Sequence, residues 1–201
     1  MSARDGVDVG EAFRPPAFRP PAFRPPAAVR DKLPVRKRNR LPLEVYTGRG
    51  AYSLTLATAA RSRWFEDPFL VDQCLQTLKE TAAACRFSVY AYCFMPDHLH
   101  LLVAGESDSA DLVDFVKRFK QSTGWWFRQR YQAGGLKASP TGLWQKSYYD
   151  HALRAEESIA SVAAYILGNP VRAALAVEVG QYPFAGSLVL ENQANEVTEC
   201  Q

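Results

Sequence analysis

Apolar and polar positions follow two different periods along the chain, and each period predicts one type of element. Residues 52–59 alternate and are rich in β-favouring side chains, which predicts a strand. Asp67-Pro68 is a typical helix start, and the apolar positions after it recur at helical spacing to about Cys85, which predicts a helix. The apolar stripe of this helix consists of Phe69, Leu70, Cys74, Leu75 and Leu78.

A hairpin is predicted next. Residues 86–95 are rich in Phe, Val and Tyr, which indicates a second strand. Pro96-Asp97 has the chemistry of a tight turn. We therefore expect residues 98–103 to return as an antiparallel strand.

Two further helices and a short strand are expected after the hairpin. One helix follows Asp108 and Ser109 and runs to about Arg130. Its inward-facing residues are Leu112, Phe115, Val116, Phe119 and Trp126. Residues 134–140 indicate a loop, and residues 143–146 a short strand. The last helix begins near Glu156 and ends by Asn169, because Pro170 disfavours helical geometry in the residue before it.

This order of elements predicts an α+β fold around an antiparallel sheet. The chain lacks the regular strand–helix alternation of doubly wound folds and contains neither a dinucleotide-binding fingerprint nor a P-loop string. Its 201 residues, 47% of them hydrophobic, suit one domain with an appendage. We expect a basic arm at 1–40, a domain at 41–187 and a tail at 188–201.

The expected arm is proline-rich and basic. Residues 12–26 hold three copies of Ala-Phe-Arg-Pro-Pro, which cannot form a helix or the interior of a sheet. Residues 1–40 carry ten Lys or Arg against four acidic residues. The run Arg36, Lys37, Arg38 and Arg40 is typical of an electrostatic contact with nucleic acid. A tandem duplication within a tolerated tail is the alternative interpretation of the repeats.

A second basic stretch runs from Lys117 to Arg154, where eight Lys or Arg face only Asp150. A polyanion lying across one side of the protein would explain this distribution, and a solvated helix face is the alternative. The DNA-contact candidates in this stretch are Lys117, Lys120, Arg128, Lys146 and, as a stacking aromatic, Trp144.

No apolar run reaches the roughly 18 residues of a membrane span, and no secretory signal is present. We therefore expect a cytoplasmic, nucleoid-associated protein. The four cysteines form no C-x-x-C pair, so we expect reduced thiols rather than a zinc or redox site.

His98 and His100 are two of only three histidines and lie two apart on a predicted strand. Side chains at this spacing point to the same face, which makes the pair a usable half of a metal site. Imidazole with amide or carboxylate oxygen suits Mg²⁺ or Mn²⁺ when a phosphate supplies further oxygens. Two partly exposed histidines without a metal are the alternative interpretation.

Tyr165 and Asn169 lie one turn apart on the last predicted helix, on one flank of its apolar face. If this helix packs near the histidine strand, Asn169 could complete the metal shell and Tyr165 could present its phenol to a metal-bound phosphate. The alternative interpretation is an aromatic at the edge of the core and an asparagine that ends the helix before proline.

Three segments resemble a known family. Residues 92–103, YCFMPDHLHLLV, are similar to the H-U-H segment of the insertion-sequence single-tyrosine transposases. Residues 165–175, YILGNPVRAAL, resemble the tyrosine helix of one branch of that family, the REP-associated tyrosine transposases. Residues 144–154, WQKSYYDHALR, are similar to the segment that precedes this helix in the same branch. The resemblance covers roughly residues 42–187.

The resemblance implies a ferredoxin-like antiparallel sheet with helices on one face, in a protein that binds single-stranded or hairpin DNA. It implies cleavage of single-stranded DNA that leaves a 5′-phosphotyrosine and a free 3′-hydroxyl, with Tyr165 as nucleophile and His98, His100 and Asn169 as ligands of Mg²⁺ or Mn²⁺. Mobile-element members commonly have glutamine at the position of Asn169. His151 and Arg154 match the branch pattern and are candidates for DNA contact. A homodimer and a monomer are both compatible with the family.

Two other classes of function are alternatives. A histidine-based phosphodiesterase or nucleotide hydrolase would need a third alternate histidine, where this chain has Leu102, or two separated H-x-Thr or H-x-Ser motifs, which it lacks. A DNA-hairpin or RNA-binding regulatory module without catalysis would use aromatics to stack unpaired bases.

Overall fold

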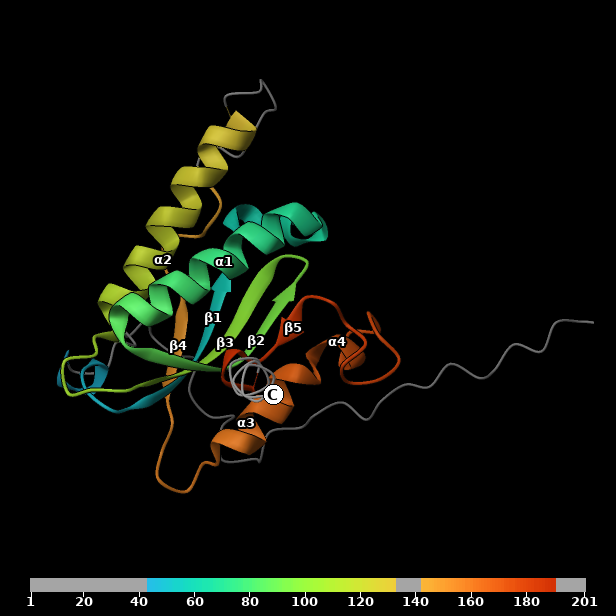
Figure 1. The fold of residues 1–201 in the computed structure, drawn as a ribbon. Coiled ribbons are helices and arrows are strands. Elements are labelled where there is room, and N and C mark those ends of the chain that lie inside the picture. The colour runs from blue at the N-terminus through green and yellow to red at the C-terminus, as the bar shows by residue number, and fades with distance from the viewer. Residues whose placement is uncertain (1–42, 133–141, 191–201) are drawn as a thin grey trace, which may run out of the picture. The chain divides into compact units, whose positions relative to one another are not determined.

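The structure, a computed structural model, describes residues 43–132 and 142–190 (Figure 1). The predicted arm with Arg36, Lys37, Arg38 and Arg40, the loop at 134–140 and most of the tail lie outside these residues. Within the described part, Leu188 is buried in the core, one residue beyond the expected end of the domain.

A five-stranded antiparallel sheet forms the centre of the fold, in the order β4-β1-β3-β2-β5. Its strands are β1 (Ala51–Ala57), β2 (Phe87–Met95), β3 (His98–Gly105), β4 (Tyr149–Ala152) and β5 (Ala185–Gly186). The predicted hairpin is confirmed, since β2 and β3 are joined only by Pro96 and Asp97.

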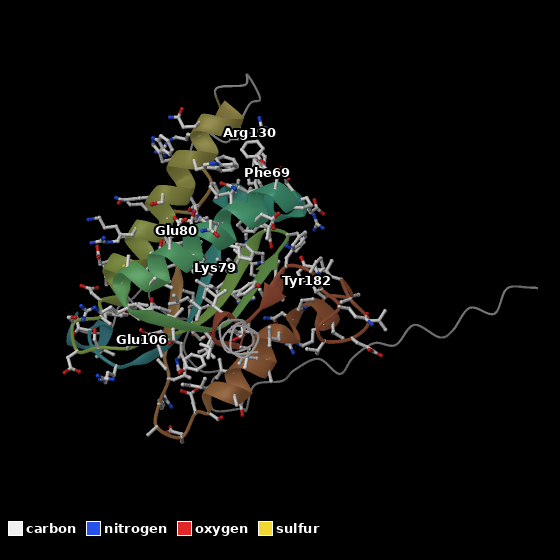
Figure 2. The ribbon with its side chains drawn as sticks, viewed as in Figure 1. Phe69, Lys79, Glu80, Glu106, Arg130 and Tyr182 are labelled. Atoms are coloured by element: carbon white, nitrogen blue, oxygen red, sulfur yellow. The ribbon has the colours of Figure 1, made fainter. Side chains whose placement is uncertain are left out.

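Helices α1 (Pro68–Cys85) and α2 (Leu112–Phe127) lie side by side on one face of the sheet (Figure 1). Each begins at an aspartate whose side chain accepts hydrogen bonds from the first backbone N–H groups, Asp67 for α1 and Asp111 for α2. The hydroxyl of Tyr131 donates to Asp67, which ties the π-helical turn after α2 to the start of α1. Nearby, Arg130 of that turn lies over the Phe69 ring of α1 (Figure 2).

Helix α3 (Ile159–Leu167) packs on the opposite face, against β2 and β3, and the short α4 (Asn169–Arg172) follows it (Figure 1). The family resemblance implied helices on one face only. Both faces can be covered because β2 and β3 carry apolar side chains on each side, and a bulge at Tyr90 places Val89 toward α1 and both Ala91 and Cys93 toward α3. The sheet therefore has an apolar cluster on each side.

The α+β fold predicted from the sequence is confirmed, with differences at element ends. Residues 143–146 form no strand. Of these residues only Trp144 makes an isolated bridge, to Thr58, and the edge strand β4 begins at Tyr149. Helix α2 begins after Asp111 instead of Ser109 because Asp111 supplies the capping carboxylate.

No helix among the described residues is long and apolar enough to cross a membrane. Cys74, Cys85 and Cys93 are free thiols, and Cys74 and Cys93 are buried.

Candidate active site

His98 and His100 lie at the start of β3 with their side chains on the face that α3 covers, while Leu99 and Leu101 point into the core beneath α1 and α2. The two Nε2 atoms are 3.0 Å apart and the rings are nearly perpendicular, at 86°. Two ligands in neighbouring positions of an octahedron, each about 2.1 Å from the metal, lie about 3.0 Å apart. The pair therefore fits two adjacent positions around one divalent ion.

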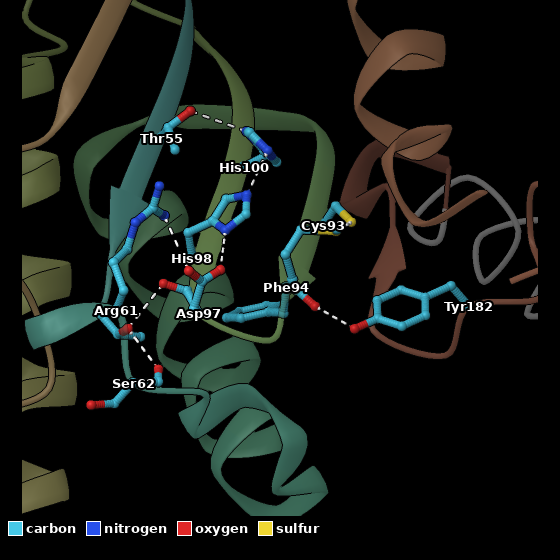
Figure 3. A network of polar contacts seen from close by, with 11 residues as sticks. Thr55, Arg61, Ser62, Cys93, Phe94, Asp97, His98, His100 and Tyr182 are labelled. Atoms are coloured by element: carbon cyan, nitrogen blue, oxygen red, sulfur yellow. Dashed lines mark hydrogen bonds and ion pairs between the residues drawn. The ribbon is translucent and has the colours of Figure 1, made fainter. Parts of the chain in front are cut away.

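Asp97 and Thr55 hold the other nitrogen of each imidazole (Figure 3). Nδ1 of His98 lies 2.6 Å from Oδ1 of Asp97, and because a carboxylate only accepts, this Nδ1 carries the hydrogen. In the neutral ring, Nε2 of His98 then has a free lone pair. Nδ1 of His100 lies 3.0 Å from Oγ1 of Thr55, a hydroxyl that can donate or accept. Thr55 can thus serve either tautomer of His100.

The surroundings of His100 favour its neutral form. Burial lowers its pKa, and the positive charges of His98, Arg172 and Arg61 lower it further, to about 4, against the opposing charge of Asp97. The imidazole is therefore uncharged at neutral pH, as a metal ligand must be.

Tyr165 and Asn169 are brought together by Arg172 at the α3–α4 junction. The guanidinium of Arg172 lies 4.1 Å from the centre of the Tyr165 ring and donates to Oδ1 of Asn169 at 2.6 Å. It also donates to the backbone oxygen of Tyr165. Gly168 makes room for this arrangement, since a Cβ there would lie 2.9 Å from Nη1 of Arg172. Tyr165 itself is 61% exposed, so its phenol is accessible to a large substrate.

The histidine pair and the pair Tyr165 and Asn169 lie on the same face of the sheet. Among the described residues, no hydrogen bond joins Tyr165 or Asn169 to either histidine. Arg172 links them electrostatically, through its effect on His100. Nδ2 of Asn169 is buried and has no hydrogen-bond partner within residues 43–132 and 142–190, while Oδ1 is held by Arg172. No cluster of three or more His, Cys, Asp or Glu that could hold a metal occurs in the part of the chain that the structure describes. A metal at the pair would therefore need oxygen ligands of another kind, such as an amide or a phosphate.

A groove of about 510 Å³ between α2 and residues 142–146 gathers four of the DNA-contact candidates, Lys120, Arg128, Trp144 and Lys146. Lys120 donates to the backbone oxygens of Gln145 and Lys146 and so fixes this wall of the groove. Trp144 is only 7% exposed and donates its indole N–H to Thr123, whereas Trp125 in the same groove is 58% exposed. Trp125 is thus the aromatic available for stacking.

The remaining candidates in the described residues lie elsewhere. Lys117 is exposed on α2, and Arg154 is exposed in the turn before α3. His151 is paired with the carboxylate of Glu157, which also accepts from the backbone N–H of Arg154. These bonds close the turn that leads into α3.

Four residues near the site were missed from the sequence: Thr55, Arg61, Asp97 and Arg172. Asp97 adjoins His98 in the predicted turn, a signal that was present but not used. Thr55 is recognised only once the register of β1 against β3 is known, because it lies opposite His100.

Comparison with known proteins identifies relatives of the chain. It is 24% identical over 144 residues to a protein of Haemophilus influenzae assigned as a REP-associated tyrosine transposase, which covers 70% of this chain and 81% of that one. It is 28% identical over 100 residues to the REP-associated tyrosine transposase of Escherichia coli, covering 49% of this chain and 53% of that one.

The fold is shared with a solved REP-associated tyrosine transposase bound to a REP hairpin, with a TM-score of 0.55 and 20% identity over 70% of this chain and 78% of the other. The sequence profile described as "Transposase IS200 like" matches residues 47–169. Because this match spans more than half of the 201 residues, the chain belongs to the family of IS200-like transposases.

Proposed function

We propose that this transposase nicks and rejoins single-stranded DNA through a covalent bond to Tyr165, with a divalent cation, Mg²⁺ or Mn²⁺, at His98 and His100. The observation that carries the proposal is the histidine pair, whose Nε2 atoms converge to 3.0 Å on the face where α3 presents the accessible Tyr165. His98, His100 and Asn169 are the proposed protein ligands.

The reaction is a transesterification. The phenol of Tyr165 loses its proton to water, its oxygen attacks the scissile phosphorus, and the bond from phosphorus to the 3′ oxygen breaks. The leaving 3′ oxygen takes up a proton, and the 5′ end remains as a phosphotyrosine that a free 3′-hydroxyl can attack to rejoin the strand. A bound divalent ion would withdraw charge from the phosphate oxygens.

The proposed roles of the other residues follow from their contacts. Asp97 and Thr55 orient the imidazoles so that both Nε2 lone pairs face the same point. Arg172 holds the Tyr165 ring and Oδ1 of Asn169 in one place. Since an amide oxygen has two lone pairs, Asn169 can accept from Arg172 and still offer a lone pair to a cation.

The proposed partner is hairpin DNA with single-stranded flanks. The solved relative bound to a REP hairpin supports this partner. The groove beside α2 supports it as well, because Lys120, Arg128 and Lys146 supply positive charge beside the exposed ring of Trp125. Arg154, Lys117 and the basic run at 36–40 are proposed as further phosphate contacts.

The test is covalent capture. The purified protein is incubated with labelled single-stranded hairpins from its own genomic neighbourhood, with and without Mn²⁺, and analysed on a denaturing gel. We expect a metal-dependent protein–DNA adduct that Tyr165→Phe abolishes without loss of hairpin binding. Nicking by Tyr165→Phe at the wild-type rate would exclude Tyr165 as nucleophile. Tight binding with no adduct on any flanking-sequence hairpin would instead indicate a DNA-binding regulatory module.

A further inference from the structure

Two consecutive non-glycine residues after β1 adopt left-handed backbone geometry. Ala60 has φ 54° and ψ 20°, and Arg61 has φ 55°. A left-handed residue other than glycine is strained, because its Cβ lies too close to the following carbonyl oxygen. Strain of this kind persists only where the surroundings impose it, and it is concentrated at functional sites.

A buried threonine imposes the strained turn. Thr58 is fully buried, and its hydroxyl lies within hydrogen-bond distance of the backbone oxygens of Ser62 at 2.7 Å and Asp97 at 2.9 Å. The backbone N–H of Thr58 donates to the same Asp97 oxygen, at 3.0 Å. The turn is therefore fastened directly to the residue that precedes the histidine pair.

This turn directs the Arg61 side chain along His98 toward the histidine pair (Figure 3). Nη1 of Arg61 lies 3.5 Å from the Asp97 carboxylate, whose other oxygen meets His98. The Arg61 side chain is still 56% exposed, so its guanidinium retains donors for a ligand. The positive charge of Arg61 lowers the pKa of His100, as does the charge of Arg172. Arg61 comes from the turn after β1 and Arg172 from α4, so two different segments bring cations to the histidine pair.

We infer that Arg61 binds a phosphate of the reacting DNA strand beside the histidine pair. The inference rests on the proposed function, since it assigns a ligand within that site. A guanidinium can donate two parallel hydrogen bonds to two oxygens of one phosphate. A metal ion that holds a single phosphate oxygen does not provide this two-point contact. The strained turn is then the structural cost of holding this cation in place before DNA arrives.

The test pairs a change in the protein with a change in the DNA. Wild-type protein first maps the cleavage position by covalent capture. Binding is then measured in the Tyr165→Phe background, on strands with and without an uncharged methylphosphonate at that position. Arg61→Gly is the informative variant, because glycine adopts the left-handed geometry without strain and should leave the fold at least as stable. Arg49→Ala is the control, since Arg49 pairs with Asp108 at the other end of β1.

With Arg61 present, we expect the methylphosphonate to weaken DNA binding about 10-fold, which is the size of one charge-assisted contact. With Arg61→Gly, the loss should be much smaller. Arg49→Ala should respond like the parent. Equal losses in both proteins would overturn the contact and leave the proposed function intact. A lower unfolding midpoint for Arg61→Gly would also count against it, because Arg61 would then be structural. Absence of any cleavage by wild-type protein would overturn the proposed function and this inference together.

Discussion

At the scale of single residues, Thr55 can hydrogen-bond to either tautomer of His100. Without a metal, Nε2–H of His100 donates to His98 and the Thr55 hydroxyl donates to Nδ1. With a metal at Nε2, the hydrogen must sit on Nδ1, and Thr55 must accept it. A side chain that only donates or only fills space could not serve both states.

We therefore predict that Thr55→Val weakens Mn²⁺ binding by about 10- to 100-fold, the usual effect of losing such a supporting partner. Isothermal titration of the protein without DNA measures it. Thr55→Ser keeps the hydroxyl and should bind nearly as well as wild type. Equal affinity for Thr55→Val and wild type would mean that the bond to His100 has no role in holding a cation.

Cys93 reports whether α3 covers the sheet. It lies opposite His100 in the β2–β3 register, and burial raises the pKa of its thiol to about 12. Because only the thiolate reacts, we predict that iodoacetamide at pH 8 modifies the partly exposed Cys85 well before Cys93, as peptide mass spectrometry would measure. The unfolded thiol ionises near pH 8.5 and the folded one only near 12, so the free energy of unfolding falls as pH rises between them. Rapid modification of native Cys93 would mean that α3 opens readily.

The sequence predicted site residues only where two of them lie on the same strand or the same helix. His98 and His100 follow from the two-residue period of a strand, and Tyr165 and Asn169 from the turn of a helix. Thr55 lies on β1 and Arg61 in the turn after it, and their nearness to the histidines depends on the β1–β3 register and on that strained turn. No local pattern encodes either.

At the scale of elements, the α3–α4 junction depends on the missing side chain of Gly168. Helix α3 ends at Leu167, before Pro170 as predicted, and Pro170 sits in the first turn of the next helix, α4, where its absent N–H is not needed. The chain therefore turns once more and brings Arg172 back over Gly168 to Tyr165.

We predict that Gly168→Ala displaces Arg172 and slows covalent capture to about the extent that Arg172→Ala does. Capture rates under single-turnover conditions give the comparison. The double variant should be no slower than either single variant, because both changes remove the same contact. Additive losses would show that Gly168 and Arg172 act independently.

The end of α1 offers a separate test of the fold. Arg86 caps this helix with φ 58° and ψ 56°, a left-handed geometry that glycine adopts without strain. Arg86→Gly should raise the free energy of unfolding by about 1 kcal/mol, whereas Arg86→Ala should leave it nearly unchanged. Urea unfolding measures both. A loss of stability in Arg86→Gly would mean that the arginine side chain supports the fold.

The elements themselves were predictable wherever period and caps agreed, as for α1, β2 and β3. The edge strand was misplaced because Leu143 and Trp144 are apolar, yet it is packing beside α2 that buries them. Tyr149–Ala152 pairs with β1 although it is only partly buried, so hydrophobicity gave no signal for it.

At the scale of the whole molecule, the sheet separates the two regions that we propose contact DNA. The histidine pair and α3 occupy one face, and α2 with its basic groove belongs to the other. A hairpin with a single-stranded flank can contact both regions by passing around the β4 edge.

Under this arrangement, Trp125→Ala should weaken binding of the DNA, measured by fluorescence anisotropy, by about 1–3 kcal/mol while leaving Mn²⁺ affinity unchanged. A matched change at Phe69, exposed on α1, should have no effect.

The basic segment at residues 1–40 is the remaining source of positive charge, with ten Lys or Arg. If it contacts DNA, its removal must reduce the number of counterions released on binding, and the logarithm of affinity should fall less steeply with the logarithm of salt concentration. Each phosphate contact on a single strand contributes about 0.7 to this slope. Deletion of residues 12–26 removes three of the arginines, whereas replacement of Arg36, Lys37, Arg38 and Arg40 by alanine removes the compact run. A larger change in slope for the second variant would assign the contact to the run beside the domain. An unchanged slope in both, and in the full truncation, would mean that the segment serves something other than DNA.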